Sequence, residues 1–71
     1  MNIKEAILQG LKDFNNEYNE PAFMRQLFIH DPETKELYTD GQLTYYLTRL
    51  AKEGKVERIP TPNDAYRYLA K

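Results

Sequence analysis

The sequence predicts a small α+β domain in which three helices are followed by a two-stranded antiparallel hairpin. Three stretches carry apolar residues at helical spacing, the third of them ends at a glycine, and the pattern after that glycine becomes strand-like. The chain has 71 residues, enough for one modest hydrophobic core. We therefore expect residues 1–71 to form a single domain.

The first predicted helix covers residues 3–14. Asn2 and Glu5 have the spacing of an N-terminal cap, and the Asn15–Asn16 pair closes the segment. Gly10 lies inside this helix and weakens it by about 1 kcal/mol relative to alanine, so tertiary packing must compensate. The inward side consists of apolar residues spaced by three or four positions: Ile3, Ile7, Leu11 and Phe14.

A second, shorter helix is predicted over about residues 21–30. Pro21 suits a first helical position, and Phe23, Leu27 and Phe28 then fall on one side. The helix stops before Pro32, because a residue that precedes proline is driven out of the helical region.

The same region also has a second interpretation. Leu27–His30 could be a strand that turns through Asp31–Lys35 into a second strand, Glu36–Thr39. Polar and apolar residues alternate poorly in Leu27–His30, which favours the helix over the hairpin.

The third helix, at about residues 40–53, is the most fully specified element. Thr39 and Gln42 form a capping box, and Tyr38 and Leu43 have the spacing of a hydrophobic staple. Gly54 can adopt the left-handed conformation that ends a helix. The inward stripe consists of Leu43, Leu47, Leu50 and Ala51.

The chain after Gly54 has the composition of a β-hairpin. Lys55–Ile59 and Ala65–Ala70 are rich in strand-forming residues, and the Thr61–Asp64 segment between them has turn chemistry. Val56 and Leu69 are the predicted inward residues.

The residue inventory argues against an enzyme. The sequence has no serine and no cysteine, which removes the usual activated nucleophiles, and His30 is its only histidine. The acidic residues between Asp31 and Asp40 lack the spacing of a calcium loop. The three glycines are too far apart to cradle a phosphate. We expect no cofactor and no metal site.

Composition also indicates a compartment. The absence of cysteine is typical of a reducing environment, and no apolar run approaches the about 20 residues of a membrane span. The N-terminus lacks the pattern of a signal peptide. These features predict a cytoplasmic protein without a membrane partner.

Charge is unevenly distributed, although the net charge is only −1. Residues 1–33 have three basic and six acidic side chains, a balance of −3, whereas residues 34–71 have seven basic and five acidic, a balance of +2. A basic half favours an anionic partner. On a helical wheel, Tyr45, Arg49 and Lys52 lie opposite the leucine stripe, and a helix of this chemistry can contact base edges and phosphates.

The order of elements, with GQLTYYLTRLAKEGKVERI across the last helix and the hairpin, resembles the winged helix-turn-helix family. The resemblance implies that the third helix enters the DNA major groove and that the hairpin is the wing. It implies groove contacts from Gln42, Thr44, Tyr45, Thr48 and Arg49. It implies phosphate contacts from Lys52, Lys55, Arg58 and Arg67. The expected function is sequence-specific binding of double-stranded DNA by a small bacterial or phage transcriptional regulator.

An alternative is a protein–protein interaction module on the same scaffold, without DNA binding. The sequence contains six tyrosines, a residue type enriched at interface hot spots. The mild acidity agrees with this alternative, and a homodimer fits either function.

Overall fold

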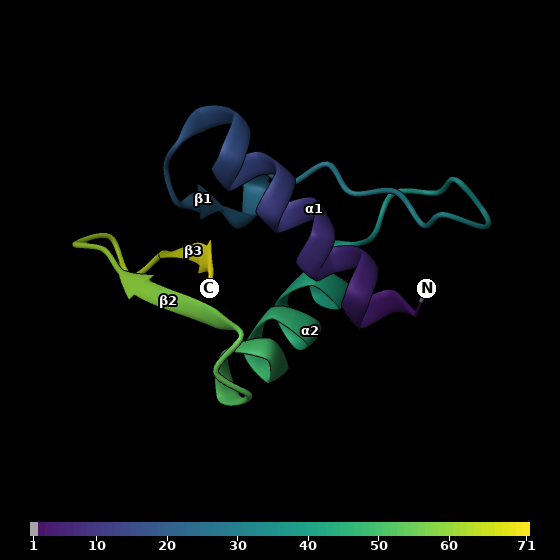
Figure 1. The fold of residues 1–71 in the computed structure, drawn as a ribbon. Helices are drawn as coiled ribbons and strands as arrows, with labels where there is room; N and C mark the ends of the chain where they lie inside the picture. The colour runs from purple at the N-terminus through teal and green to yellow at the C-terminus, as the bar shows by residue number, and fades with distance from the viewer. Residues whose placement is uncertain (1) are drawn as a thin grey trace.

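The computed structural model describes residues 2–71, which form two helices and one three-stranded antiparallel sheet (Figure 1). In chain order the elements are α1 (Ile3–Tyr18), β1 (Ala22–Phe23), the short 3-10 helix η1 (Met24–Gln26), α2 (Asp40–Lys52), β2 (Val56–Pro60) and β3 (Tyr66–Ala70). No helix among residues 2–71 has both the length and the apolar character needed to cross a bilayer.

The predicted architecture of three helices and a two-stranded hairpin is wrong, because residues 21–30 do not form a helix. Residues 22 and 23 instead form β1, which joins the hairpin as a third strand. The turn after it is only one 3-10 turn, in which the Gln26 side chain accepts the Phe23 N–H at 2.9 Å. Leu27 then returns to an extended conformation.

The alternative hairpin over residues 27–39 is closer to the structure. The Tyr38 N–H donates to the Ile29 carbonyl at 2.9 Å, and the Asp31 N–H donates to the Glu36 carbonyl at 2.8 Å. Only one bridge, between His30 and Leu37, has regular strand pairing. Residues 29–38 are therefore a narrow two-stranded ribbon, which reaches away from the helices in Figure 1. We call it the 29–38 ribbon.

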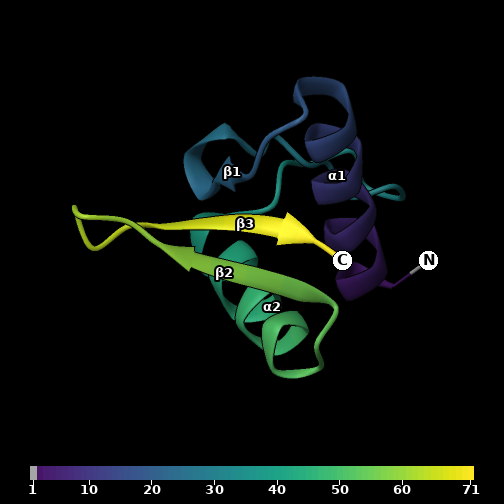
Figure 2. The same ribbon diagram turned by 60° about the vertical axis from the view of Figure 1, so that its left-hand side comes forward.

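The sheet has the order β1–β3–β2 and lies across α2 (Figure 2). Arg58 and Ala22 both pair with Tyr68 from opposite sides, so these three residues share the face that packs on the helices. Tyr68 is buried there, whereas Leu69 is partly exposed on the other face with Glu57. The prediction that Leu69 points inward was one position out of phase; Val56 is inward as expected.

The core forms where α1, α2 and this sheet face meet. Its fully buried large side chains come from all three parts: Ile7, Leu11, Leu43, Leu47, Leu50 and Val56. Each contributes about 2 kcal/mol relative to an exposed position. The three leucines are those of the predicted third-helix stripe, so that inward face is confirmed.

Helix α1 is longer than predicted, because Asn15 does not end it. The Asn15 side chain is buried; its amide donates to the Glu20 carbonyl at 2.9 Å and to the Tyr68 carbonyl at 3.3 Å. Its oxygen accepts the Ala70 N–H at 2.8 Å. The helix ends later, where Asn19 adopts a left-handed conformation with φ of 54°. Asn15 thus joins α1 to both β3 and the loop before β1.

Gly10 is required by close packing between α1 and the 29–38 ribbon. A Cβ at this position would lie 2.6 Å from Cγ1 of Ile29. We expect Gly10→Ala to destabilise the protein by about 1–3 kcal/mol, because overpacking outweighs the better helix propensity. Urea unfolding measures this. In an Ile29→Ala background the same change should be neutral or stabilising, and a Gly10→Ala protein more stable than wild type would contradict the packing.

The N-terminal cap of α2 is confirmed in both directions. The Gln42 N–H donates to the Thr39 hydroxyl at 3.1 Å, and the Thr39 N–H donates to the Gln42 side-chain oxygen at 2.9 Å. At the other end Gly54 has φ of 77°, as a left-handed terminator requires. Tyr38 and Leu43 are both buried in the core, as the staple predicts.

Asp31 organises the turn of the 29–38 ribbon. Its carboxylate accepts the Glu33 and Thr34 N–H groups at 2.8 and 3.0 Å, and the Tyr38 hydroxyl donates to it at 3.2 Å. The backbone hydrogen bond from Thr34, followed by that from Glu33, lowers the pKa of Asp31 below its usual value.

A depressed carboxyl pKa gives stability that is present above its unfolded value, near pH 4, and that is lost as the pH falls through the folded value. Asp31→Asn should therefore show a smaller loss of unfolding free energy than wild type between about pH 6 and about pH 3. Chemical denaturation at both pH values measures it, with Glu33→Gln as control. Equal pH dependence in wild type and Asp31→Asn would contradict this role.

Candidate nucleic-acid interface

The exposed side of α2 is the candidate interface. Because Leu43, Leu47 and Leu50 face the core, the residues on the opposite side of the helix face solvent. Between Gly41 and Lys52 the helix has no carboxylate. We call this side the α2 surface, and its residues are Gln42, Tyr45, Thr48, Arg49 and Lys52.

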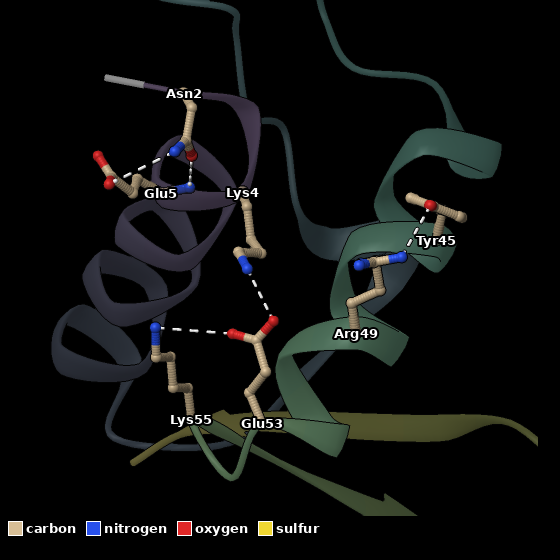
Figure 3. Close-up of polar contacts among 7 residues, drawn as sticks. All are labelled: Asn2, Lys4, Glu5, Tyr45, Arg49, Glu53 and Lys55. Atoms are coloured by element: carbon tan, nitrogen blue, oxygen red, sulfur yellow. Dashed lines mark hydrogen bonds and ion pairs between the residues drawn. The ribbon is translucent and has the colours of Figure 1, made fainter.

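Tyr45 and Arg49 form a pair one helical turn apart on this surface (Figure 3). The guanidinium Nη1 of Arg49 donates to the Tyr45 hydroxyl at 3.0 Å, and its Cζ lies 5.4 Å from the ring centroid. Tyr45 is held in turn by an edge-to-face contact with Tyr46, with ring centroids 5.0 Å apart. The Arg49 charge is therefore oriented while it stays exposed.

The remaining helix residues differ in whether their side chains already form contacts within the protein. The capping box uses the side-chain oxygen of Gln42. The Thr44 hydroxyl donates to the Met24 sulfur at 3.0 Å, which turns it toward η1 and away from the centre of the α2 surface. Thr48 is half-buried, and Lys52 is exposed in the last turn.

Arg58 lies beside this helix on the hairpin. Its guanidinium carbon is 4.6 Å from the centroid of the Tyr66 ring on the neighbouring strand. Tyr66 and Thr44 line the same small pocket, so the Arg58–Tyr66 stack borders α2. The stack is thus a second cation packed on an aromatic ring, and it lies beside Thr44 at the edge of α2.

Lys55 lies at the junction of α1, α2 and β2. Its amine is 3.6 Å from Glu53, whose carboxylate also accepts a 2.7 Å hydrogen bond from Lys4 (Figure 3). The hydrogen bond from Lys4 lowers the pKa of Glu53, so this carboxylate stays ionised and partly neutralises both lysines. An exposed pair of this kind is worth about 0–1 kcal/mol, so a phosphate can displace it.

Arg67 is placed differently from the other eight predicted site residues. Its Nη2 donates to the Pro21 carbonyl at 2.7 Å, and it lies 3.8 Å from the Glu20 carboxylate and 4.9 Å from the Phe23 ring centroid. It also projects from the sheet face opposite Tyr68, because neighbouring strand residues alternate. These contacts tie β3 to the segment that leads into β1, which gives Arg67 a structural role.

The structure therefore places the Arg58–Tyr66 stack at the edge of α2 and leaves Arg67 on the other side of the sheet. Tyr66 is a member of this region that sequence reasoning missed. The signal was present in the hairpin: Tyr66 lies two residues before Tyr68, the cross-strand partner of Arg58, and such diagonal neighbours are within reach of long side chains.

Comparisons with protein families, with curated proteins and with solved structures found no match for this chain.

Proposed function

We propose that this protein binds double-stranded DNA through the α2 surface and the β2–β3 hairpin. The observation that carries the proposal is a capped, exposed helix side with two cations and no carboxylate, bordered by the Arg58–Tyr66 stack. Six of the eleven acidic side chains lie before residue 34, outside this region, whereas Glu57 and Asp64 lie on the hairpin.

A helix of this size fits the ligand. The major groove is about 12 Å wide, and a helix with its side chains is about 10–12 Å across. In this arrangement Arg49, with Tyr45 holding its guanidinium, faces base edges, and Gln42 and Thr48 border it. Lys52, Lys55 and Arg58 contact phosphates on either side. Arg49 is the residue to which we assign sequence choice, because a guanidinium can read guanine with two hydrogen bonds.

The sequence resemblance to winged helix-turn-helix proteins supports this proposal only through the order α2, β2, β3, because residues 21–30 do not form the second helix of that motif. The wing is the β2–β3 hairpin. Its tip carries Asp64, so we assign the phosphate contact to Arg58 in the strand and not to the tip. A role in transcription follows as a proposal from sequence-specific binding.

The salt dependence of binding tests the number of phosphate contacts. With Arg49, Lys52, Lys55 and Arg58 as the cations at the interface, the slope of log affinity against log salt should be no steeper than about −4. Fluorescence anisotropy with a labelled random duplex over a salt series measures it. A slope near zero, or no binding at low salt, would contradict the proposal.

A further inference from the structure

A groove on another side of the molecule is not used by the proposed DNA contact. It lies between one side of α1 and residues 25–32, has a volume of about 910 Å³, and is open to solvent. Its lining residues that the structure describes all lie between Ala6 and Pro32. The stretch of α1 from Ala6 to Tyr18 is about 18 Å long, the length of a short helix.

The floor and one wall of the groove are apolar and closely packed. The floor is the contact of Ile29 with Gly10, where no space remains for a Cβ. The wall is formed by Phe14 and Tyr18, whose ring centroids are 4.7 Å apart. A surface that is already shaped loses little conformational freedom when a partner binds.

The rim presents an apolar side chain without a packing role in the core. Phe28 is 74% exposed, the largest value among the large hydrophobic side chains of residues 2–71, and Tyr18 is 57% exposed. The predicted second helix had placed Phe28 on the same side as Phe23 and Leu27. Exposed aromatic residues around a groove are typical of protein-interaction sites.

The rim is also acidic. Asp13, Glu17 and Glu20 line it, of which Glu20 also lies 3.8 Å from Arg67. Arg25, over the Phe23 ring at 4.5 Å, and His30 are the basic residues among the described lining. Charge complementarity therefore favours a cationic partner, which Asp13 and Glu17 would face. Two copies joined through this groove in a symmetric dimer would bring two acidic rims together, which disfavours self-association here, and the same charge repels nucleic acid.

We propose that this groove binds a basic amphipathic helical segment of a partner protein. Apolar side chains one turn apart would lie on Ile29 and between Phe14 and Phe28, while lysine or arginine on the flanks would face Asp13 and Glu17. This is the helix-in-groove mode of recognition, and it is independent of DNA binding because no α2 or hairpin residue contributes to it.

The probe is a fluorescein-labelled synthetic helix of about 14 residues, with leucine at helical spacing on one side and lysine on the flanks. A peptide of the same pattern with glutamate in place of lysine is the control ligand. We expect saturable binding of the basic peptide by anisotropy, and amide shifts confined to residues 6–18 and 25–32. Phe28→Ala should weaken binding at least about tenfold.

Leu37→Ala is the matched control for Phe28→Ala, because Leu37 is also exposed, at 52%, and lies outside the groove. Glu17→Lys should reduce the affinity for the basic peptide by about fivefold at low salt, and by less at high salt. Glu33→Lys makes the same charge change outside the groove and should have little effect. All four positions are exposed, and amide spectra verify that each variant is folded.

Three results would overturn the proposal: no saturable binding of the basic peptide, equal affinity for Phe28→Ala and wild type, or amide shifts centred on α2. Retained peptide binding in a protein that fails to bind duplex DNA would refute the proposed function alone. Loss of peptide binding with intact duplex binding would refute the groove alone.

Discussion

Asn15→Asp is expected to lower the unfolding free energy at neutral pH by about 3 kcal/mol, the largest stability effect of any single change proposed here. The native amide donates to the Glu20 and Tyr68 carbonyls, and an ionised carboxylate has no proton to donate to either. A buried unpaired carbonyl costs about 1–3 kcal/mol, and repulsion from the new charge adds to it. The midpoint temperature of thermal unfolding should fall by more than about 10 °C.

The pH dependence separates this mechanism from simple loss of packing. Burial against two carbonyls should raise the pKa of the introduced carboxyl above its unfolded value. The variant should then regain stability as the pH falls through that raised value, since the protonated acid can donate one hydrogen bond. Asn16→Asp on the exposed side of α1 is the control and should change stability by under about 0.5 kcal/mol. Equal effects at positions 15 and 16 would refute the role of Asn15.

Arg49→Glu is expected to reduce the affinity for duplex DNA by at least about 100-fold at about 50 mM salt. The change removes the cation that Tyr45 holds at 3.0 Å and places an anion in the middle of the α2 surface. The residue is exposed, so the fold should persist. The milder Arg49→Ala should reduce the difference in binding free energy between preferred and other DNA sequences by about 1–3 kcal/mol. Lys55→Ala should instead weaken binding to all duplexes about equally.

Lys12→Glu is the matched control, because it makes the same change in net charge at an exposed position of α1. It should reduce duplex affinity far less than Arg49→Glu, since the effect of a surface charge falls off beyond about 10 Å at 0.1 M salt. Anisotropy with one labelled duplex compares the two variants. Similar losses for both would mean that net charge, and not the α2 surface, governs binding.

The elements that the sequence predicted correctly are those whose signals are local. The cap from Thr39 and Gln42, the leucine stripe and the turn at Gly54 all lie within one stretch of chain, and each has the predicted geometry. The N-terminal cap of α1 was also predicted correctly from a local signal: the Asn2 side chain accepts the Glu5 N–H.

The errors arise where distant segments decide the local structure. Residues 22 and 23 become a strand because β3 offers an open edge, and a two-residue strand has no alternation to recognise. Phe28 was predicted to share one side of a helix with Phe23 and Leu27, but it is exposed, because the 29–38 ribbon holds the chain extended. Asn15 has the composition of a helix end, yet its hydrogen bonds to Ala70 and Tyr68 place it inside the protein.

The same distinction holds for the candidate interface. Tyr45 and Arg49 share a helix, so their proximity follows from spacing alone. The positions of Arg58 and Arg67 could not be predicted in this way, because they depend on which face of the sheet each strand residue occupies and on the presence of the third strand, β1. Only the structure shows that Arg58 borders α2, while Arg67 is bonded to Pro21.

Titration of the ¹⁵N-labelled protein with duplex DNA at low salt tests DNA binding by the α2 surface most directly. Amide shifts should concentrate in residues 41–60, on α2 and β2, and should diminish as salt is added. Residues 6–18 and 25–32, which line the acidic groove, should stay unmoved. An unchanged spectrum for residues 41–60 at saturating duplex would contradict the account.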